Sequence, residues 1–107
     1  MKIIIEGKTY NTATADHICT LDNKNDVSYD DFKLEYADLY KTPNGRFFFS
    51  GCGGALTRWA IRQPGGGLCG SILHSILAIS EQEAREFCEK HGNHEDYVRA
   101  FGECEEA

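Results

Sequence analysis

Cysteine and histidine gather near the C-terminal end of the chain. Cys88, His91 and His94 follow one another at intervals of three residues, and in a helix the first two would lie one turn apart. Thiolate and imidazole groups at this spacing can bind zinc, with Cys104 or an acid as a further ligand. The structural alternative is stronger, because Gly92 interrupts the helical register and Cys88 falls on a face predicted to be buried. We therefore expect neither a metal site nor a cofactor.

Nucleophilic catalysis would require a cysteine or serine beside a base that a third group orients. The four histidines and five cysteines form no such local pattern. The glycines at 51–54 lack the spacing of a dinucleotide fingerprint, and no P-loop lysine follows them. They are interpreted instead as positions that permit positive φ at a strand exit. The sequence therefore predicts a protein that is not an enzyme, and a metal-dependent enzyme stays the least favoured alternative.

Acidic side chains are the most distinctive chemical feature of the chain. The formal net charge is −6, and residues 41–70 contain four bases and no acid, so the acids lie towards the two ends. Binding to a phosphate backbone requires Lys and Arg, so we predict a partner with a basic protein surface and no direct nucleic-acid binding. The predicted partner-binding residues are Asp16, Asp22, Asp26, Asp30, Asp31, Glu83, Glu86, Glu89, Glu95 and Asp96.

These acids allow two interpretations. As two ridges, one before residue 32 and one after residue 80, they would imitate the regular negative charge of a nucleic-acid backbone. As ordinary surface residues, they would only keep the exposed faces solvated. The oligomeric state and any pairing of the cysteines stay open.

The secondary structure predicted around these residues indicates a single α+β domain spanning residues 1–107. Phe32, Leu34 and Tyr36 alternate with Lys33 and Glu35, which predicts a half-buried strand with the first three side chains inside. With the turn Thr42-Pro43-Asn44-Gly45, this strand predicts a β-hairpin over 32–50, the centre of a small antiparallel sheet. Strands are also expected at 2–5, 8–10 and 72–79. Two to three helices should pack on the sheet, at 13–21, 80–91 and after Asn93, with a frayed acidic tail at 103–107.

The longest apolar run falls far short of the roughly 20 residues that cross a bilayer, so no membrane association is expected. The first residues lack the cleavage site of a secretory signal. The five cysteines are an odd number at irregular spacing, which is typical of free thiols in a reducing compartment. We therefore expect a cytoplasmic protein.

Four segments together resemble a family of small proteins carried by bacterial phages, plasmids and integrative elements. They are GKTYNTATA at 7–15, LYKTPNGRFF at 39–48, GCGGA at 51–55 and SEQEAREF at 80–87. Small acidic proteins of this kind are similar to anti-CRISPR proteins, which bind CRISPR–Cas effector complexes, some of them by mimicking DNA. The resemblance implies an inhibitor that acts in the bacterial cytoplasm and blocks target DNA recognition. The alternative is a mobile-element regulatory protein that binds another host or element protein.

Overall fold

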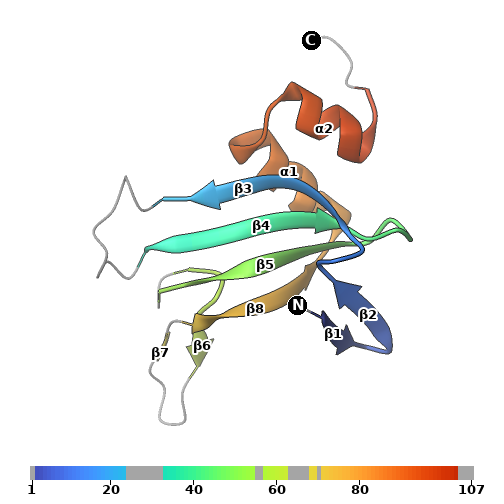
Figure 1. The fold of residues 1–107 in the computed structure, drawn as a ribbon. Coiled ribbons are helices and arrows are strands. Elements are labelled where there is room, and N and C mark those ends of the chain that lie inside the picture. Colours follow the sequence, from blue (N-terminus) through green and yellow to red (C-terminus); the bar gives the residue numbers. More distant parts are fainter. Residues whose placement is uncertain (1, 24–32, 55–56, 63–67, 70, 104–107) are drawn as a thin grey trace.

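The computed structural model describes residues 2–23, 33–54, 57–62, 68–69 and 71–103. It has three antiparallel sheets and two helices (Figure 1). The largest sheet has the strand order β3-β4-β5-β8, and β1-β2 and β6-β7 form two-stranded sheets. The strands are β1 (Lys2–Ile5), β2 (Lys8–Asn11), β3 (Asp16–Asp22), β4 (Glu35–Lys41), β5 (Phe47–Gly53), β6 (Ile61–Arg62), β7 (Leu68–Cys69) and β8 (Ser71–Ile79), and the helices are α1 (Glu81–His91) and α2 (His94–Phe101). The predicted α+β class is confirmed.

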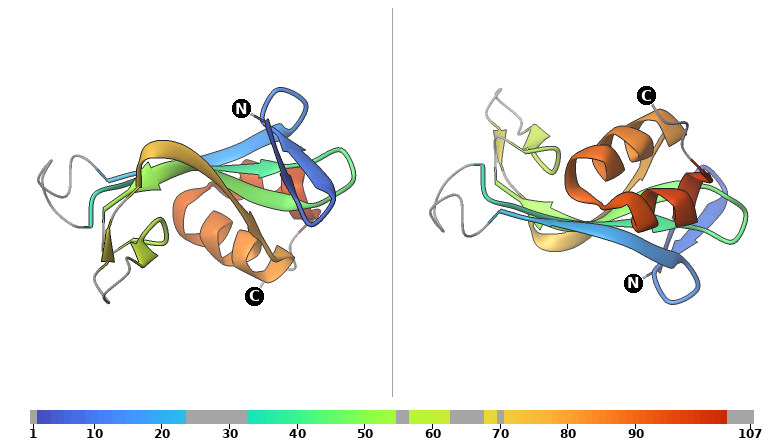
Figure 2. Two further views of the ribbon diagram at one scale, coloured as in Figure 1. Left: turned by 90° about the horizontal axis from the view of Figure 1, so that it is seen from below. Right: turned by 90° about the horizontal axis from the view of Figure 1, so that it is seen from above.

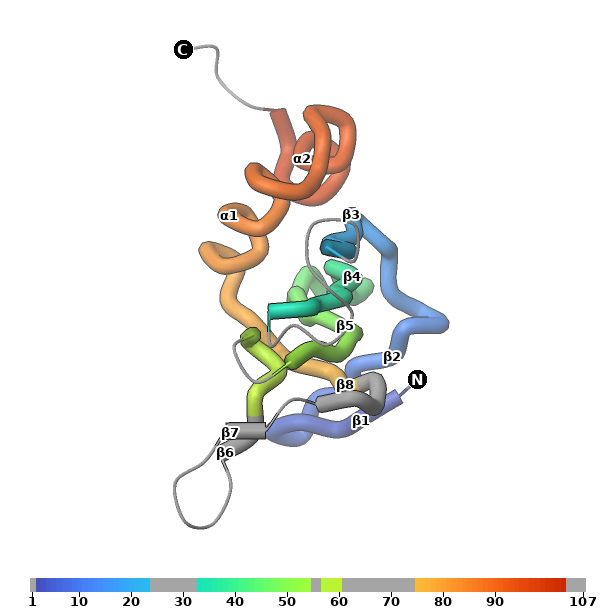
Figure 3. Tube along the Cα trace, turned by 90° about the vertical axis from the view of Figure 1, so that its left-hand side faces the viewer, coloured from blue at the N-terminus to red at the C-terminus, as the bar shows by residue number. Residues whose placement is uncertain are grey.

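The four-stranded sheet has an apolar cluster on each face. On one face, the buried side chains of α1 and α2 pack against Leu39 and Phe49. On the other, the β1–β2 hairpin contributes Tyr10, which packs with Phe48 and Ile76. Figure 2 shows the two helices together on one side of the sheet and the β1–β2 hairpin across the other. Figure 3 shows α1 and α2 to one side of the strands and the β1–β2 hairpin next to β8.

The predicted central hairpin is confirmed as β4–β5. Thr42 N–H donates to Arg46 O at 2.7 Å, and Gly45, at φ 84°, closes the turn. The prediction of which face of this strand is buried is wrong, however. Glu35, Ala37 and Leu39 are the buried residues of β4, whereas Tyr36, of the parity expected inside, lies on the opposite face. Phe32 lies outside the described residues.

The helix expected at 13–21 is wrong, since this segment forms a turn and then β3. The Asn11 side chain accepts from Ala13 N–H at 2.9 Å, and Asn11 O accepts from Thr14 and Ala15, which makes a local turn instead of a helix cap. Pairing with the full length of β4 then supplies the backbone hydrogen bonds. Tertiary pairing of this kind overrides the weak helical preference of a short segment.

The glycines expected to permit positive φ at the end of β5 have a different role. The glycines with positive φ are Gly7, Gly45 and Gly102 among the described residues. A Cβ on Gly51 would lie 2.0 Å from Tyr36 O, and one on Gly53 would lie 2.4 Å from Thr57 Oγ1. Glycine is therefore required at these two positions, because neighbouring parts of the chain approach so closely that no side chain would fit.

Both C-terminal helices begin and end as predicted. The Ser80 hydroxyl accepts from Glu83 N–H at 3.1 Å, and Asn93 and Asp96 form a reciprocal capping box. Gly92 and Gly102 follow the last helical residues. Neither helix has the length and apolar character of a membrane span within the described part of the chain. The predicted tail at 103–107 lies outside the described residues from 104 onward.

Candidate functional site

Three of the predicted partner-binding acids form one row along α1. Glu83, Glu86 and Glu89 are spaced by three residues, all are exposed, and they lie away from the buried face. Glu86 accepts from Gln82 at 3.0 Å, and Glu83 accepts weakly from the Ser80 hydroxyl at 3.4 Å. Within the described residues, none of the three is ion-paired with a base. The row therefore presents three carboxylates to solvent.

The acids of α2 have mixed roles. Glu95 is exposed, and no hydrogen bond or ion pair within the described residues involves it. Asp96 instead completes the capping box, since it accepts from Asn93 N–H at 3.2 Å, and it lies 3.5 Å from Arg99. Glu95 is thus available to a partner, whereas Asp96 is occupied in stabilising the start of its helix.

The N-terminal acids do not form one described ridge. Asp16 pairs in register with Lys41, and Asp22 pairs with Tyr36, at opposite ends of β3 and on opposite faces of the sheet. Six residues of strand separate them by roughly 20 Å. The remaining three predicted residues of this group, Asp26, Asp30 and Asp31, lie outside the described residues.

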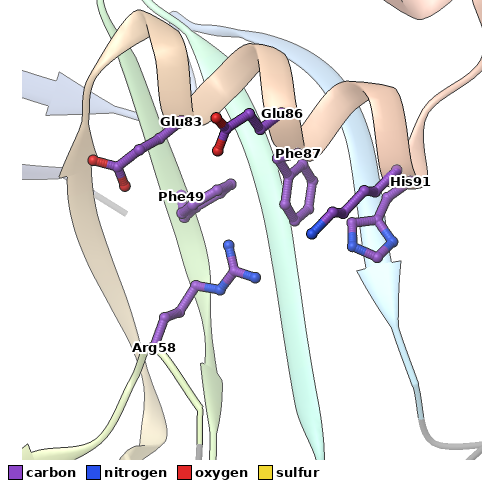
Figure 4. Close-up of a pocket in the computed structure, with 7 residues that line it drawn as sticks. Phe49, Arg58, Glu83, Glu86, Phe87 and His91 are labelled. Carbon is purple, nitrogen blue, oxygen red and sulfur yellow. The ribbon is translucent and has the colours of Figure 1, made fainter.

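A pocket of about 200 Å³ opens between α1 and the turn after β5. Glu83 and Glu86 of the acidic row lie along one side, Phe49 and Phe87 form the apolar part, and Arg58 closes it from the turn (Figure 4). Lys90 and His91 complete the lining. The pocket thus has a negative end at the acidic row and a positive end beside it.

Arg58 is held in place by aromatic and ionic contacts together. Its guanidinium carbon lies 4.7 Å from the ring centre of Phe49 and 5.3 Å from that of Phe87, within the range of cation–π interactions. Its Nε lies 2.5 Å from Glu35 Oε2, a carboxylate on β4 that is almost fully buried. Arg58 and Glu35 are far apart in the sequence, so no spacing of residues could have predicted this ion pair.

His91 lies at the same end of the pocket as Arg58 and Lys90, but its side chain is neutral. Burial lowers the pKa of its imidazole, and the positive charges of Arg58 and Lys90 lower that pKa further. Its ring lies 4.8 Å from the Phe87 ring, between centres. His91 therefore packs against the pocket wall in its uncharged form at neutral pH.

Removing the Arg58 guanidinium should destabilise the fold, because it leaves the Glu35 carboxylate buried without its partner. We expect Arg58→Met to lower the free energy of unfolding by about 3 kcal/mol, as for other broken buried pairs. Glu35→Gln in the same chain should restore most of this loss, since no charge then stays buried. Urea denaturation of the single and double variants measures both effects. Equal losses in Arg58→Met and in the double variant would contradict a buried pair.

A second polar cluster, not predicted from the sequence, lies on the other sheet face. Asp38 Oδ1 accepts from Thr20 Oγ1 at 2.5 Å and from Tyr36 OH at 3.3 Å, and His17 Nε2 lies 3.0 Å away. Burial raises the pKa of Tyr36 and of Tyr40, and Asp38 raises both further, so these phenols stay protonated. Thr20, Asp38 and the other residues of the cluster lie on the same face of the sheet. The sequence could have indicated this only if the register between β3 and β4 had been known.

This cluster is arranged as a structural network and not as a nucleophile with its base. His17 Nε2 lies 2.9 Å from Thr20 Oγ1 and also faces Asp38, so one ring nitrogen contacts both groups. A relay would instead need the two ring nitrogens to contact the nucleophile and the acid separately. The Thr20 hydroxyl already donates to Asp38, so Asp38 is a shared acceptor for side chains of β3 and β4.

The cysteines that the structure describes as free are Cys19, Cys52 and Cys88. Burial raises the pKa of Cys19 to about 12, with a smaller effect from the neighbouring Cys88, and burial also raises the pKa of Cys88. Cys88 is part of the core, as predicted. In the described part of the chain, no group of three or more His, Cys, Asp and Glu side chains could hold a metal ion.

Comparisons with protein-family models, with curated proteins and with solved structures give no match to this chain. The acidic row of α1, Glu95 of α2 and the adjoining pocket are therefore assigned as the candidate site on geometry and charge alone.

Proposed function

We propose that this chain is a protein inhibitor of the anti-CRISPR type, which binds a CRISPR–Cas effector complex and blocks its access to target DNA. The observation that carries the proposal is the row Glu83, Glu86 and Glu89, exposed along one helix and without an ion-paired base in the described residues. The family resemblance of the sequence supplies the class of partner. The row supplies a surface that fits basic residues of a DNA-binding channel.

The electrostatic balance of the two helices supports this surface. Residues 81–101 contain six acids and three bases, Arg85, Lys90 and Arg99. Arg85 and Arg99 are engaged with Glu81 and Asp96, at 3.6 and 3.5 Å. Arg85 and Arg99 therefore neutralise acids outside the row, and Lys90, one turn after Glu86, is the base that lies beside it. Side chains three residues apart on a helix have Cβ atoms about 5–6 Å apart, which gives a regular series of negative charges.

The pocket beside the row extends the proposed contact. A lysine or arginine of the effector could place its charged end between Glu83 and Glu86, and its carbon stem along the apolar wall. Arg58 and Lys90 would repel a second cation at the opposite end of the pocket. This polarity would orient the partner, which is how charged groups mainly contribute to specificity.

Reversing the row should abolish inhibition without unfolding the protein. We expect the triple variant Glu83→Lys/Glu86→Lys/Glu89→Lys to bind the effector roughly 100-fold more weakly, because exposed charge pairs contribute up to about 1 kcal/mol each. Phage plaque counts on bacteria with active CRISPR systems of several types measure the protection. The wild-type chain should protect phage against at least one type, and the triple variant should not.

The single reversals Glu86→Lys and Glu6→Lys provide a matched control, because each changes the net charge equally and Glu6 lies in the turn between β1 and β2. Only Glu86→Lys should weaken protection. Absence of protection against every type tested would reject the inhibitor and favour a regulatory protein that binds another host or element protein. If the triple variant still protects phage, the chain would be an inhibitor that does not bind through the acidic row.

A further inference from the structure

The turn between β4 and β5 contains an asparagine followed directly by a glycine, Asn44-Gly45. Both residues are exposed, and Figure 1 shows the turn projecting beyond the end of the four-stranded sheet. A Cβ on Gly45 would meet nothing within 4 Å, so no neighbouring group crowds this residue. The backbone nitrogen of Gly45 and the side chain of Asn44 can therefore approach each other without obstruction.

Asn44 differs from the other described asparagines in the state of its side chain. Asn11 and Asn93 each accept a hydrogen bond from a backbone N–H, at 2.9 and 2.8 Å. Asn23 is held at both ends, because its amide group donates to a backbone carbonyl at 2.8 Å and its carbonyl oxygen accepts from a backbone N–H at 2.7 Å. Within the described residues, no hydrogen bond involves the side chain of Asn44. Its amide is thus able to rotate towards the next backbone nitrogen.

The residue that follows each asparagine adds to this difference. A side chain on that residue hinders attack by its backbone nitrogen on the asparagine amide, and glycine removes the hindrance. The other asparagines of the chain, at 11, 23, 25 and 93, are followed by Thr12, Lys24, Asp26 and His94. Gly45 N–H donates to Thr42 O at 2.9 Å, so the turn must open before the nitrogen can react. Opening is local, because exposed turns lie at the low-stability end of a structure.

We propose that Asn44 is a site of spontaneous deamidation, through a cyclic imide formed with Gly45. The deprotonated backbone nitrogen of Gly45 attacks Cγ of Asn44, the bond from Cγ to Nδ2 breaks, and the amide nitrogen takes up protons from water and leaves as ammonia. Water then opens the ring. Addition at Cγ gives aspartate, and addition at the main-chain carbonyl carbon gives isoaspartate. One water is consumed and one ammonia is released, with no oxidation or reduction.

The isoaspartyl product should loosen the β4–β5 hairpin. Its main chain runs through Cβ and Cγ of residue 44, which lengthens the turn by one backbone atom. The two backbone hydrogen bonds that close the turn, at 2.7 and 2.9 Å, both span this longer path. Phe47 begins β5 directly after the turn, and its ring is stacked on Phe101 of α2 at 5.1 Å between centres. Isoaspartate at this position should therefore also weaken the packing of α2 on the sheet.

Peptide mapping of the wild-type chain tests the site. Trypsin cleaves after Lys41 and Arg46, which separates Asn44 from every other asparagine. We expect the peptide 42–46 to exchange its amide NH2 for OH during storage at mildly alkaline pH, before any other asparagine peptide changes. A freshly purified sample digested in parallel corrects for change during digestion. Deamidation of another asparagine first, or an unchanged peptide 42–46 after several weeks, would overturn the proposal.

Thermal melting tests the consequence for the fold. A stored sample, in which a protein isoaspartyl methyltransferase labels the peptide 42–46, should melt several degrees below the fresh chain. The variant Asn44→Asp should melt close to the fresh chain, because aspartate is favourable in turns and keeps the normal backbone. Stored Asn44→Gln should keep its melting temperature, since ring closure is slower for glutamine. An equal loss in stored Asn44→Gln, or no loss in the labelled wild type, would overturn the effect on the hairpin.

Discussion

Gly51→Ala is expected to cost at least about 4 kcal/mol of unfolding free energy, an exceptional loss for a single methyl group. The added Cβ would lie 2.0 Å from Tyr36 O and 2.9 Å from Ala37 Cα. Both atoms belong to the backbone of β4, so no side-chain rotation can relieve the clash. The two central strands would have to separate, and the aromatic residues of β5 would lose their packing on both faces of the sheet.

Urea denaturation followed by circular dichroism measures this loss. Gly45→Ala is the matched control, because its Cβ would meet nothing within 4 Å and its cost comes only from a φ of 84°. That conformation costs an alanine about 1–2 kcal/mol. If Gly51→Ala unfolds at the same urea concentration as Gly45→Ala, the close approach of β4 and β5 at this position is wrong.

Phe49→Ala should destabilise the protein by about 3–5 kcal/mol, the range for buried aromatic residues. Phe49 is 2% exposed, and its ring lies 4.7 Å from that of Phe87, between centres. The substitution would leave a cavity between the sheet and α1 and would remove one of the two rings that hold Arg58. For a domain of this size the melting temperature should fall by roughly 15 °C or more.

A control for this prediction is Ile4→Ala, which also truncates a large apolar residue in a strand. Ile4 is 69% exposed, so its loss should change the free energy of unfolding by only about 0.5 kcal/mol. Calorimetric melting of both variants makes the comparison. Phe47→Ala should resemble Phe49→Ala, because Phe47 is also buried on the helical face. A Phe49→Ala variant as stable as Ile4→Ala would place Phe49 outside the core.

Local sequence signals predicted the elements that local chemistry determines. The turn Thr42-Pro43-Asn44-Gly45 gave the β4–β5 hairpin, and Ser80 and Asn93 gave the starts of α1 and α2. Each of these signals acts within a few residues, because a turn or a cap depends on nearby backbone groups. The spacing of Ala84, Phe87, Cys88 and His91 predicted one buried face of α1. The first three are buried, whereas His91 is exposed.

Features that depend on contacts across the sheet were not predicted. The segment at 16–22 has a capping residue and alanines before it, yet pairing with β4 makes it a strand. Glu35 was expected between buried neighbours and is itself buried, because Arg58 from a distant turn neutralises it. The Asp38 cluster joins residues of two strands, and its composition becomes visible only once their register is known.

The candidate site shows the same division. Helical spacing correctly put Glu83, Glu86 and Glu89 on exposed positions of α1. It could not show that Asp16 and Asp22 point to opposite faces of β3, since the segment was expected to be helical. It also could not show the pocket beside the row, which needs Phe49 and Arg58 from other parts of the chain.

The dependence of effector affinity on salt tests most directly whether the acidic row makes the contact. As ionic strength rises from 0.1 M to 1 M, the Debye length falls from ~10 Å to ~3 Å, and attraction between exposed charges is screened. We expect the dissociation constant of the wild-type chain to rise at least tenfold over this range. The variant Glu83→Lys/Glu86→Lys/Glu89→Lys should bind weakly throughout, with little further loss. A wild-type affinity that stays constant across this range would contradict binding through the acidic row.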